Sequence, residues 1–232
     1  MPEPERRQVL ITRPEPDAAE TAAKVAALGF EPVVAPVLQI LPGPFMSLAR
    51  FDAVLLTSRN AVPALRPELR GRRVLAVGSA TAARAREAGF TDVLDADGDA
   101  SDLAALAERA CAPGSSLLVL HGQGQGGALV ATLRSAGFRV RRRVGYSVAS
   151  VRTFPAAGST ALAGGAVRAA LFLSAETARA FVRLLPTRRA AALGEVEALA
   201  IGQPAADVLT PLPWRRVRVS VRPTLDHLLG LL

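Results

Sequence analysis

The stretch LLVLHGQGQGGALVATL, residues Leu117–Leu133, contains a strand, a turn and a helix in succession. The apolar run LLVL predicts a buried strand, and the apolar spacing of GALVATL predicts a helix. Gly122, Gly124 and Gly127 lie in the intervening turn and match the spacing G-x-G-x-x-G. A strand that passes through a turn into a helix is the repeating unit of parallel α/β proteins.

The glycine turn (residues 122–127) does not by itself identify a nucleotide site. A dinucleotide-binding fold needs an acidic residue about 20 positions beyond the glycines, where it binds the ribose hydroxyls. No Asp or Glu occurs from Ala128 to Thr160. Arg141–Arg143 could accept a 2′-phosphate, so an NADP-linked reductase stays open as an alternative. A tight turn without a ligand explains the glycines at least as well.

The same alternation of strand and helix extends along the chain. It predicts an α/β fold with parallel sheets flanked by helices. The predicted strands cover residues 8–14, 51–58, 72–78, 92–97, 168–174, 196–202 and 216–221, and the predicted helices cover residues 17–28, 79–89, 102–111, 175–185 and 203–209, with a helix start at 59–65 and a last helix from Thr224.

Three pairs of segments repeat in the sequence. LITRP resembles LVLHG, AVLLTSRNAVPAL resembles AALFLSAETARAF, and VLAVGSATAARA resembles ALAIGQPAADVL. The copies indicate a duplication of a unit of roughly 110 residues, which is large enough to form a domain. A cleft between two such domains is a preferred ligand site.

Composition excludes several classes of function. Lys and Arg total 28 against 20 Asp and Glu, and Lys24 is the only lysine, so an anionic partner or an arginine-rich genome would each explain the charge. One Trp and one Tyr are too few for a nucleic-acid stacking platform. One Cys and two His exclude an internal disulfide and offer no convincing metal site. No apolar run is long enough to span a membrane, and MPEPERRQ has no secretory pattern, so we expect a cytoplasmic protein.

Six predicted strands end in polar or glycine-containing turns. The carboxyl ends of parallel strands meet at one edge of a sheet, where ligands bind. Helix N-termini at that edge present backbone N–H groups to anions, although Ser, Thr and Asn there commonly act only as helix caps. The candidate binding residues are Thr12, Arg13, Ser58, Asn60, Gly78, Ser79, Thr81, His121, Gly122, Gln123, Ser174, Glu176, Thr177, Gly202 and Gln203.

Several of these segments together resemble one family. LITRP, LGFEPVVAPVLQI, FDAVLLTSRNAV, VLAVGSATAARAREAGF, RVRRRVGYSV and VSVRPTLDHLLGLL are similar, in order and spacing, to the uroporphyrinogen-III synthase family. The chain departs from the family pattern at Leu173-Ser174, where Thr-Ser is usual. It also departs at Gly202–Ala205, which lacks the threonine found in Gly78–Thr81.

The resemblance implies two similar α/β domains joined by a two-stranded connector, with a cleft between them. Residues 1–36 with 149–232 would form one domain and residues 39–146 an inserted domain, with connectors at about 35–40 and 144–150. It also implies a monomeric, cofactor-free enzyme that contains no metal and cyclises hydroxymethylbilane to uroporphyrinogen III. Tyr146, the single tyrosine, would donate a hydrogen bond to the departing hydroxyl or pack at the domain joint. A non-catalytic module that binds a small anion is the alternative.

Overall fold

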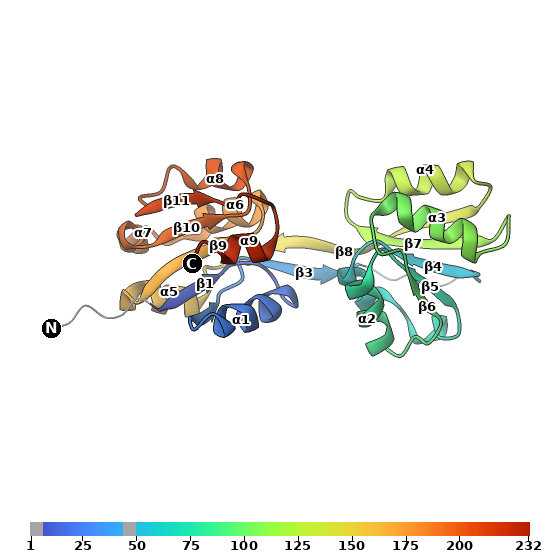
Figure 1. The fold of residues 1–232 in the computed structure, drawn as a ribbon, viewed down its shortest axis with the longest axis horizontal. Helices are drawn as coiled ribbons and strands as arrows, with labels where there is room; N and C mark the ends of the chain where they lie inside the picture. Colours follow the sequence, from blue (N-terminus) through green and yellow to red (C-terminus); the bar gives the residue numbers. More distant parts are fainter. Residues whose placement is uncertain (1–6, 44–49) are drawn as a thin grey trace. The chain divides into compact units, whose positions relative to one another are not determined.

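The computed structural model of the protein describes residues 7–43 and 50–232. The chain divides into two compact units (Figure 1). Unit 1 combines the chain up to Gln39 with Ala149–Leu232, and unit 2 is Ile40–Val148. The chain passes between the units twice, within β3 (Leu38–Pro42) and β8 (Arg139–Ser150), which are neighbouring strands of one sheet. Residues 1–6 and 44–49 of the two predicted domains lie outside the described residues.

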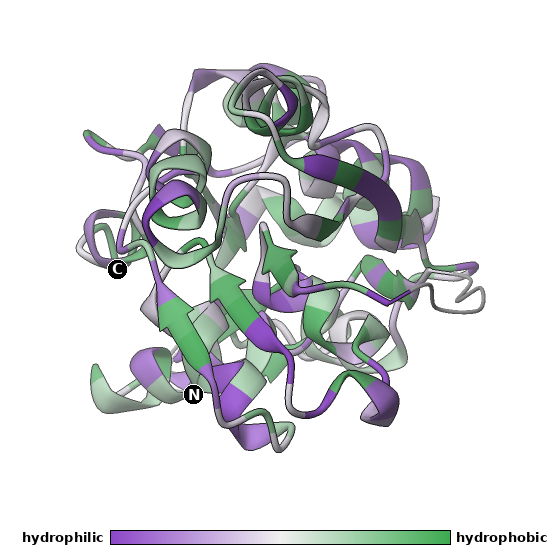
Figure 2. Ribbon diagram, turned by 90° about the vertical axis from the view of Figure 1, so that its right-hand side faces the viewer, coloured by the Kyte–Doolittle hydropathy of each residue, from purple (hydrophilic) through white to green (hydrophobic). Residues whose placement is uncertain are grey.

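Unit 2 contains a six-stranded sheet of order β3-β8-β7-β4-β5-β6. The pairs β4–β5, β5–β6, β4–β7 and β7–β8 are all parallel. Its central strands are almost wholly apolar and buried, as expected where helices cover both faces of a sheet (Figure 2). Besides β3 and β8, the strands are β4 (Ala53–Leu56), β5 (Arg73–Ala76), β6 (Val93–Asp95) and β7 (Ser116–Gly122).

The helices of unit 2 cover both faces of this sheet. One face packs against the 3₁₀ helices η1 (Arg59–Ala64) and η2 (Pro67–Leu69) and against α2 (Ser79–Glu87). The other face packs against α3 (Ala100–Ala110) and α4 (Gly127–Ser135). The connections that follow β4 and β7 therefore lie on opposite faces.

Unit 1 contains a five-stranded, fully parallel sheet of order β11-β10-β9-β1-β2. Its strands are β1 (Gln8–Ile11), β2 (Glu31–Val34), β9 (Val167–Phe172), β10 (Glu197–Ala200) and β11 (Arg216–Val219). One face packs against α1 (Asp17–Ala27) and α9 (Leu225–Leu229). The other packs against α5 (Ala156–Gly164), α6 (Ala175–Leu184) and α8 (Gln203–Leu209), and the short α7 (Thr187–Ala190) and η3 (Ala191–Glu195) connect α6 to β10.

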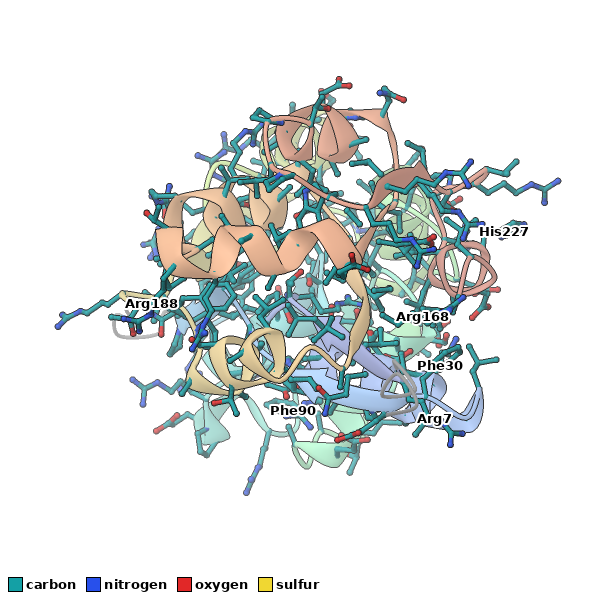
Figure 3. All side chains as sticks on the ribbon, turned by 90° about the vertical axis from the view of Figure 1, so that its left-hand side faces the viewer. Arg7, Phe30, Phe90, Arg168, Arg188 and His227 are labelled. Carbon is teal, nitrogen blue, oxygen red and sulfur yellow. The ribbon has the colours of Figure 1, made fainter. Side chains whose placement is uncertain are left out.

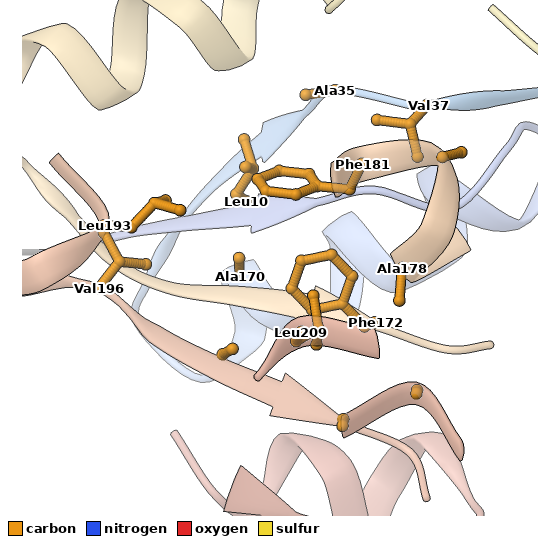
Figure 4. Packing of buried hydrophobic residues seen from close by; sticks show 14 of the residues in the cluster. Leu10, Ala35, Val37, Ala170, Phe172, Ala178, Phe181, Leu193, Val196 and Leu209 are labelled. Atoms are coloured by element: carbon orange, nitrogen blue, oxygen red, sulfur yellow. The ribbon is translucent and has the colours of Figure 1, made fainter. Parts of the chain in front are cut away.

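The larger core of unit 1 is built around aromatic rings (Figure 4). The rings of Phe172 on β9 and Phe181 on α6 are fully buried and meet edge to face, with centroids 5.1 Å apart. Trp214 contacts both rings at 5.7 and 5.6 Å. Burying one such phenylalanine contributes about 1.5–3 kcal/mol, so these contacts fix α6 against the sheet.

The two ends of unit 1's chain meet at the amino edge of its sheet. The Gln8 N–H donates to the Ala166 carbonyl at 3.1 Å, and Arg168 donates to the Leu232 carbonyl at 2.9 Å. The Arg168 guanidinium also lies 5.8 Å from the centroid of the Phe30 ring (Figure 3). The start of β1 and the last residue are therefore both held near the start of β9.

A surface ion pair joins α1 to α9 in the same unit. Lys24 Nζ donates to Asp226 Oδ1 at 2.7 Å. This hydrogen bond lowers the pKa of Asp226 and raises the pKa of Lys24. Both side chains are solvent-exposed, so we expect the pair to contribute little to folding stability.

The two sheets have equivalent strand orders. Strands β9, β10, β11, β1 and β2 occupy in unit 1 the positions of β4, β5, β6, β7 and β8 in unit 2. Each repeated pair of sequence segments occupies matching positions, since β1 corresponds to β7, β9 to β4, and β10 to β5. Unit 1 is thus a circular permutation of unit 2. Its strands β1 and β2 correspond to β7 and β8, which come last in unit 2, but β1 and β2 come first in the chain.

The predicted α/β class, with parallel sheets flanked by helices, is confirmed. Two local predictions need correction. The helix start predicted at residues 59–65 is the 3₁₀ helix η1, which contains Pro63. Proline lacks the N–H that an α-helix interior requires. Helix α5 was not predicted, because its polar and apolar residues do not separate into faces. Among the described residues, no helix has the length and apolar character needed to cross a membrane.

Candidate functional site

The six predicted turns lie at the carboxyl edges of the two sheets, three in each unit. In unit 2 they follow the adjacent strands β7, β4 and β5, and in unit 1 they follow the adjacent strands β1, β9 and β10. Parallel pairing brings each set of three turns together at one edge. Each sheet therefore carries about half of the candidate residues at its own carboxyl edge.

Each sheet also has a switch point, where two neighbouring strands send their following connections to opposite faces. In unit 2 the switch point lies between β4, followed by η1, and β7, followed by α4. In unit 1 it lies between β9, followed by α6, and β1, followed by α1. Ligands of parallel α/β sheets bind at such points. The turns after β4, β7, β9 and β1 flank these switch points, and the turns after β5 and β10 lie one strand away.

Tyr146 lies at the switch point of unit 2. The pairing of β7 with β8 shifts register between His121 and Gly122, and the shift sets Tyr146 opposite Gly122. The Gln123 N–H donates to the Tyr146 carbonyl at 2.9 Å, which fixes the turn to β8. The Tyr146 ring is buried in the core beside η1 and α2, whereas its hydroxyl has no hydrogen-bond partner among the described residues.

Gly122 is required by the Tyr146 ring. A Cβ at position 122 would lie 2.8 Å from both Cζ and the hydroxyl oxygen of Tyr146. A Cβ at Gly127, in contrast, would meet only Nη1 of Arg142, at 3.5 Å. In the G-x-G-x-x-G match, Gly122 is therefore needed to make room for Tyr146, which lies in the same sheet. At Gly127 a larger residue would fit without a clash.

His121 is a buried residue of the same turn. Its side chain is 2 % exposed, and Nδ1 lies 2.6 Å from the Gly122 carbonyl. Its Nε2 is buried and has no partner among the described residues. A Cβ at Gly126 would lie 2.9 Å from Cγ of His121, so the imidazole packs beneath the start of α4. Its ring is held by the turn itself.

The turn after β4 carries a serine cap and an asparagine. Ser58 Oγ accepts a hydrogen bond from the Asn60 N–H at 3.2 Å, so this hydroxyl caps η1. Asn60 Oδ1 is buried and lacks a partner within the described residues. Together with His121 Nε2, it leaves two orphaned polar atoms at one switch point, and such atoms in a folded protein need an explanation.

The turn after β5 leads into a helix without a side-chain cap. Gly78 is the N-cap residue of α2, and no side chain bonds the first turn. The first N–H groups of a helix have no acceptor within that helix, so those of Ser79 and Ala80 are open to a ligand. The Thr81 N–H donates to the Gly78 carbonyl at 3.1 Å, and the Thr81 side chain is buried.

In unit 1, Thr12 and Arg13 are occupied by the chain itself. Thr12 is fully buried, and its hydroxyl donates to the Leu171 carbonyl at 2.6 Å across the switch point. Arg13 forms an ion pair with Asp17 and donates to Thr21 Oγ1 at 3.2 Å. Both residues hold the start of α1 against β9, which leaves a ligand less access to them than the sequence suggests.

The turn after β9 is a side-chain cap. Ser174 Oγ accepts from the Thr177 N–H at 3.0 Å and lies 2.9 Å from Thr177 Oγ1. Glu176 is exposed in the first turn of α6, where its negative charge interacts favourably with the helix dipole and opposes a second anion.

The turn after β10 resembles the one after β5. Gly202 precedes α8 without a side-chain cap, and the exposed Gln203 donates to Asp207 Oδ1 at 2.6 Å. At the carboxyl edges, the helices without a side-chain hydrogen bond from the N-cap residue are α2 and α4 in unit 2 and α1 and α8 in unit 1. In α1 the Glu15 side chain accepts from the Ala19 N–H at 3.0 Å instead.

Gln125 and Arg142 belong to the site but were not predicted. Gln125 Oε1 lies 2.9 Å from the Cβ position of residue 122, next to the Tyr146 phenol. Arg142 lies on β8 beside the first residue of α4. Each contact depends on the register of β8 against β7, which a single sequence does not specify. The arginine run 141–143 was the only available signal for Arg142.

The site lacks groups for metal or thiol chemistry in the described part of the chain. No cluster of His, Cys, Asp and Glu there could hold a metal ion. Cys111 follows α3 at the opposite, amino edge of the sheet, and burial raises the pKa of its thiol. A surface hollow of about 400 Å³ in unit 1 is lined by α1 and α9 and includes none of the candidate residues.

The fold and the switch points define a class of protein, the two-unit parallel α/β proteins with candidate binding turns at the carboxyl edges of their sheets. Within that class, residues 19–230 match the family model "Uroporphyrinogen-III synthase HemD". The chain therefore belongs to the uroporphyrinogen-III synthase family, which acts in tetrapyrrole biosynthesis. The resemblance proposed from the sequence is confirmed.

A solved structure shares the fold. Uroporphyrinogen-III synthetase from Helicobacter pylori 26695 is 18 % identical, with a TM-score of 0.58 and 97 % of each chain covered. A mutant uroporphyrinogen III synthase from the extremely thermophilic bacterium Thermus thermophilus is 22 % identical, with a TM-score of 0.44, and the match covers 97 % of this chain and 96 % of the other. No curated protein sequence matches the chain.

Proposed function

We propose that the chain converts hydroxymethylbilane into uroporphyrinogen III with loss of water, as a cofactor-independent carbon–oxygen lyase of haem biosynthesis. The observation that carries the proposal is the family match over residues 19–230. The chemistry of the candidate turns supports it. Among the candidate residues only Arg13 and Glu176 carry a full charge, and Arg13 is already paired.

The reaction needs little from protein side chains. The substrate loses its terminal hydroxyl, assisted by the pyrrole nitrogen, and becomes an azafulvene cation. The hydroxyl leaves as water after gaining one proton. The substituted carbon of the last pyrrole attacks, and a spiro intermediate rearranges so that this ring is inverted. Closure of the macrocycle releases one proton, so the reaction consumes no net acid.

The protein must mainly control the shape of its substrate. A hundredfold preference for one ring closure requires about 2.7 kcal/mol of differential stabilisation. Positioning of reacting groups can supply roughly 7–11 kcal/mol. Holding several carboxylates in fixed places is therefore sufficient to direct closure toward the type III isomer.

We assign the carboxylate contacts first to the uncapped helix N-termini. The first turns of α2 and α4 present amides at the carboxyl edge of unit 2, and Arg142 adds a positive charge beside α4. The first turn of α8 in unit 1 contributes less, because Pro204 has no N–H and the Ala205 N–H donates to the Gly202 carbonyl, so only the Gln203 amide remains. Asn60 and His121 each offer an orphaned polar atom to the substrate.

Tyr146 is the proposed donor to the departing hydroxyl, since its own hydroxyl has no protein partner among the described residues. The proposal retains two domains, residues 1–36 with 149–232 and residues 39–146, with hinges at about 35–40 and 144–150. It also retains a monomeric cytoplasmic enzyme, which the single cysteine fits. Sedimentation of the purified chain tests the monomer.

Analysis of the product isomer tests the proposed function. Purified protein is incubated with hydroxymethylbilane, the products are oxidised, and the ring isomers are separated. We expect an excess of the type III isomer over the spontaneous type I isomer. Type I alone would leave only the alternative, a non-catalytic module that binds a small anion, and nothing found so far favours that alternative.

A further inference from the structure

Two polar side chains converge over one glycine in unit 2. The Tyr146 hydroxyl oxygen lies 2.8 Å, and Gln125 Oε1 2.9 Å, from the point where a Cβ of Gly122 would lie. The two groups reach this point from different elements, one from β8 and the other from the turn before α4. A glycine at position 122 is what admits both.

Neither group is engaged elsewhere. Within the described residues, the Tyr146 hydroxyl and the Gln125 side-chain amide have no hydrogen-bond partner. Gln125 is otherwise an exposed residue, yet its amide extends inward over Gly122. Its backbone is fixed, because the Gln125 N–H donates to the Gly122 carbonyl at 3.0 Å. The amide therefore lies beside the phenol on a short, closed turn.

We infer that Gln125 is a positioning residue for the Tyr146 hydroxyl. The inference rests on the proposed function of Tyr146 as donor to the departing hydroxyl. Both side chains approach the Cβ position of residue 122, and the structure contains no hydrogen bond between them. With substrate bound, the phenol O–H turns to the departing hydroxyl, and the amide N–H of Gln125 donates to the phenol oxygen.

An amide is the group that suits this role. It carries two N–H donors and an acceptor on one planar group, so a half-turn brings the donors to the place where Oε1 now lies. A carboxylate at the same place would accept from the phenol but could not donate to it. A thioether of similar length would fill the space but do neither. This difference separates a hydrogen-bonding role from simple packing.

Two substitutions of similar size test the inference. We expect Gln125→Met and Gln125→Glu each to lower kcat about tenfold, a part of the roughly 10²–10⁴-fold that a positioned proton donor contributes. KM should stay within about twofold, because the inference gives Gln125 no contact with a substrate carboxylate. In a Tyr146→Phe background the same substitutions should have no further effect, since coupled residues are not additive.

A spectroscopic measurement reports the contact without relying on activity. The chain has one tyrosine, so ¹³C-labelled tyrosine gives a single Cζ signal from Tyr146. Gln125→Met should move this signal, whereas Thr132→Val, on the exposed side of α4, should leave it in place. Thr132→Val is also the control for the rate.

Three results would overturn the inference. The first is a Gln125→Met enzyme with the wild-type rate, and the second is an equal loss of rate in the Tyr146→Phe background. The third is a Tyr146 signal that does not respond to Gln125→Met. A wild-type protein that gives only type I product would instead refute the proposed function, and the signal would still decide whether the two side chains interact.

Discussion

Gly122 is the residue on which the arrangement of the unit 2 turn depends. We expect Gly122→Ala to displace the Tyr146 phenol and the Gln125 amide, because the new methyl group would overlap both. A shift of about 1 Å at a reacting group can lower a rate by roughly 100-fold. Measuring kcat on hydroxymethylbilane checks the effect, with the mixture of isomers as a second readout.

Gly164→Ala is the matched control for that substitution. A Cβ at Gly164 would meet nothing within 4 Å, and the residue ends helix α5 in unit 1. Alanine in a helix is about 0.5–1 kcal/mol more favourable than glycine, so this variant should keep its rate and gain slightly in stability. If Gly122→Ala and Gly164→Ala lost activity equally, the effect of Gly122→Ala would have to be explained by impaired folding and not by displacement of Tyr146 and Gln125.

Tyr146→Phe separates packing from proton donation. Phenylalanine keeps the ring in the core beside η1 and α2. It removes only the hydroxyl, which has no hydrogen-bond partner among the described residues. We therefore expect unchanged stability in urea, slower turnover, and a product that is still type III, because carboxylate positioning sets the isomer. An unchanged rate would exclude Tyr146 from the mechanism.

The position of Tyr146 near a turn could be expected from the resemblance, but its partners could not. The sequence shows a glycine-rich turn and, further on, one tyrosine. The register shift between β7 and β8 decides which glycine faces the ring. Such a shift depends on contacts between strands, and a period of two along one strand is compatible with either register.

Among the secondary-structure elements, the serine turns and the uncapped turns divide the candidate site into two kinds. Ser58 and Ser174 bond the first turns of η1 and α6. The residues Gly78, Gly126 and Gly202 precede helices without any side-chain cap. Caps contribute to stability, whereas the uncapped turns keep their amides free for a ligand. The two kinds should therefore respond differently to substitution.

Ser174→Ala should destabilise the protein by about 1 kcal/mol, since the Thr177 N–H would lose its acceptor. Urea unfolding should show a lower midpoint with an unchanged slope. Ser79→Ala at the start of α2 removes no cap and should change stability by less than about 0.5 kcal/mol. If Ser174→Ala lowered activity with no loss of stability, Ser174 would contact substrate.

Strands were predictable at this scale because they are nearly continuous apolar runs, and the longer helices because their apolar residues recur at helical spacing. The helix predicted from Asp102 begins instead at Ala100, since Asp99 and Asp102 form a capping box one turn earlier than the apolar pattern starts. Helix α5 gives no such signal, as it contains Gly158, ends at Gly164 and has little polar contrast between its faces. Packing against β2 and β9, not local preference, stabilises it.

For the whole molecule, the permuted order of unit 1 predicts that its chain can be reconnected. Its ends meet near Ala166–Arg168. A short glycine–serine linker from Leu232 to Arg7, with new ends between the exposed residues Arg152 and Thr153, would make unit 1 continuous and ordered like unit 2. We expect this variant to fold, because permutation is tolerated where ends are close and exposed.

Circular dichroism and urea unfolding measure that outcome. A midpoint close to that of the wild type would show that the order of strands in space, and not their order in the chain, determines the stability of unit 1. A variant that failed to form the five-stranded sheet would contradict the equivalence of the two units. Opening the chain within β9 serves as the negative control, since it cuts the central strand.

The placement of β1 and β2 at the front of the chain has a consequence for biosynthesis. As the polypeptide leaves the ribosome, these two strands emerge first, but β9, their central partner, is made only after all of unit 2. Until then β1 presents an unpaired edge, and such edges attract other chains. The nascent protein should consequently depend on early folding of its middle portion, and on chaperone protection of its first strands, more than a continuous relative would.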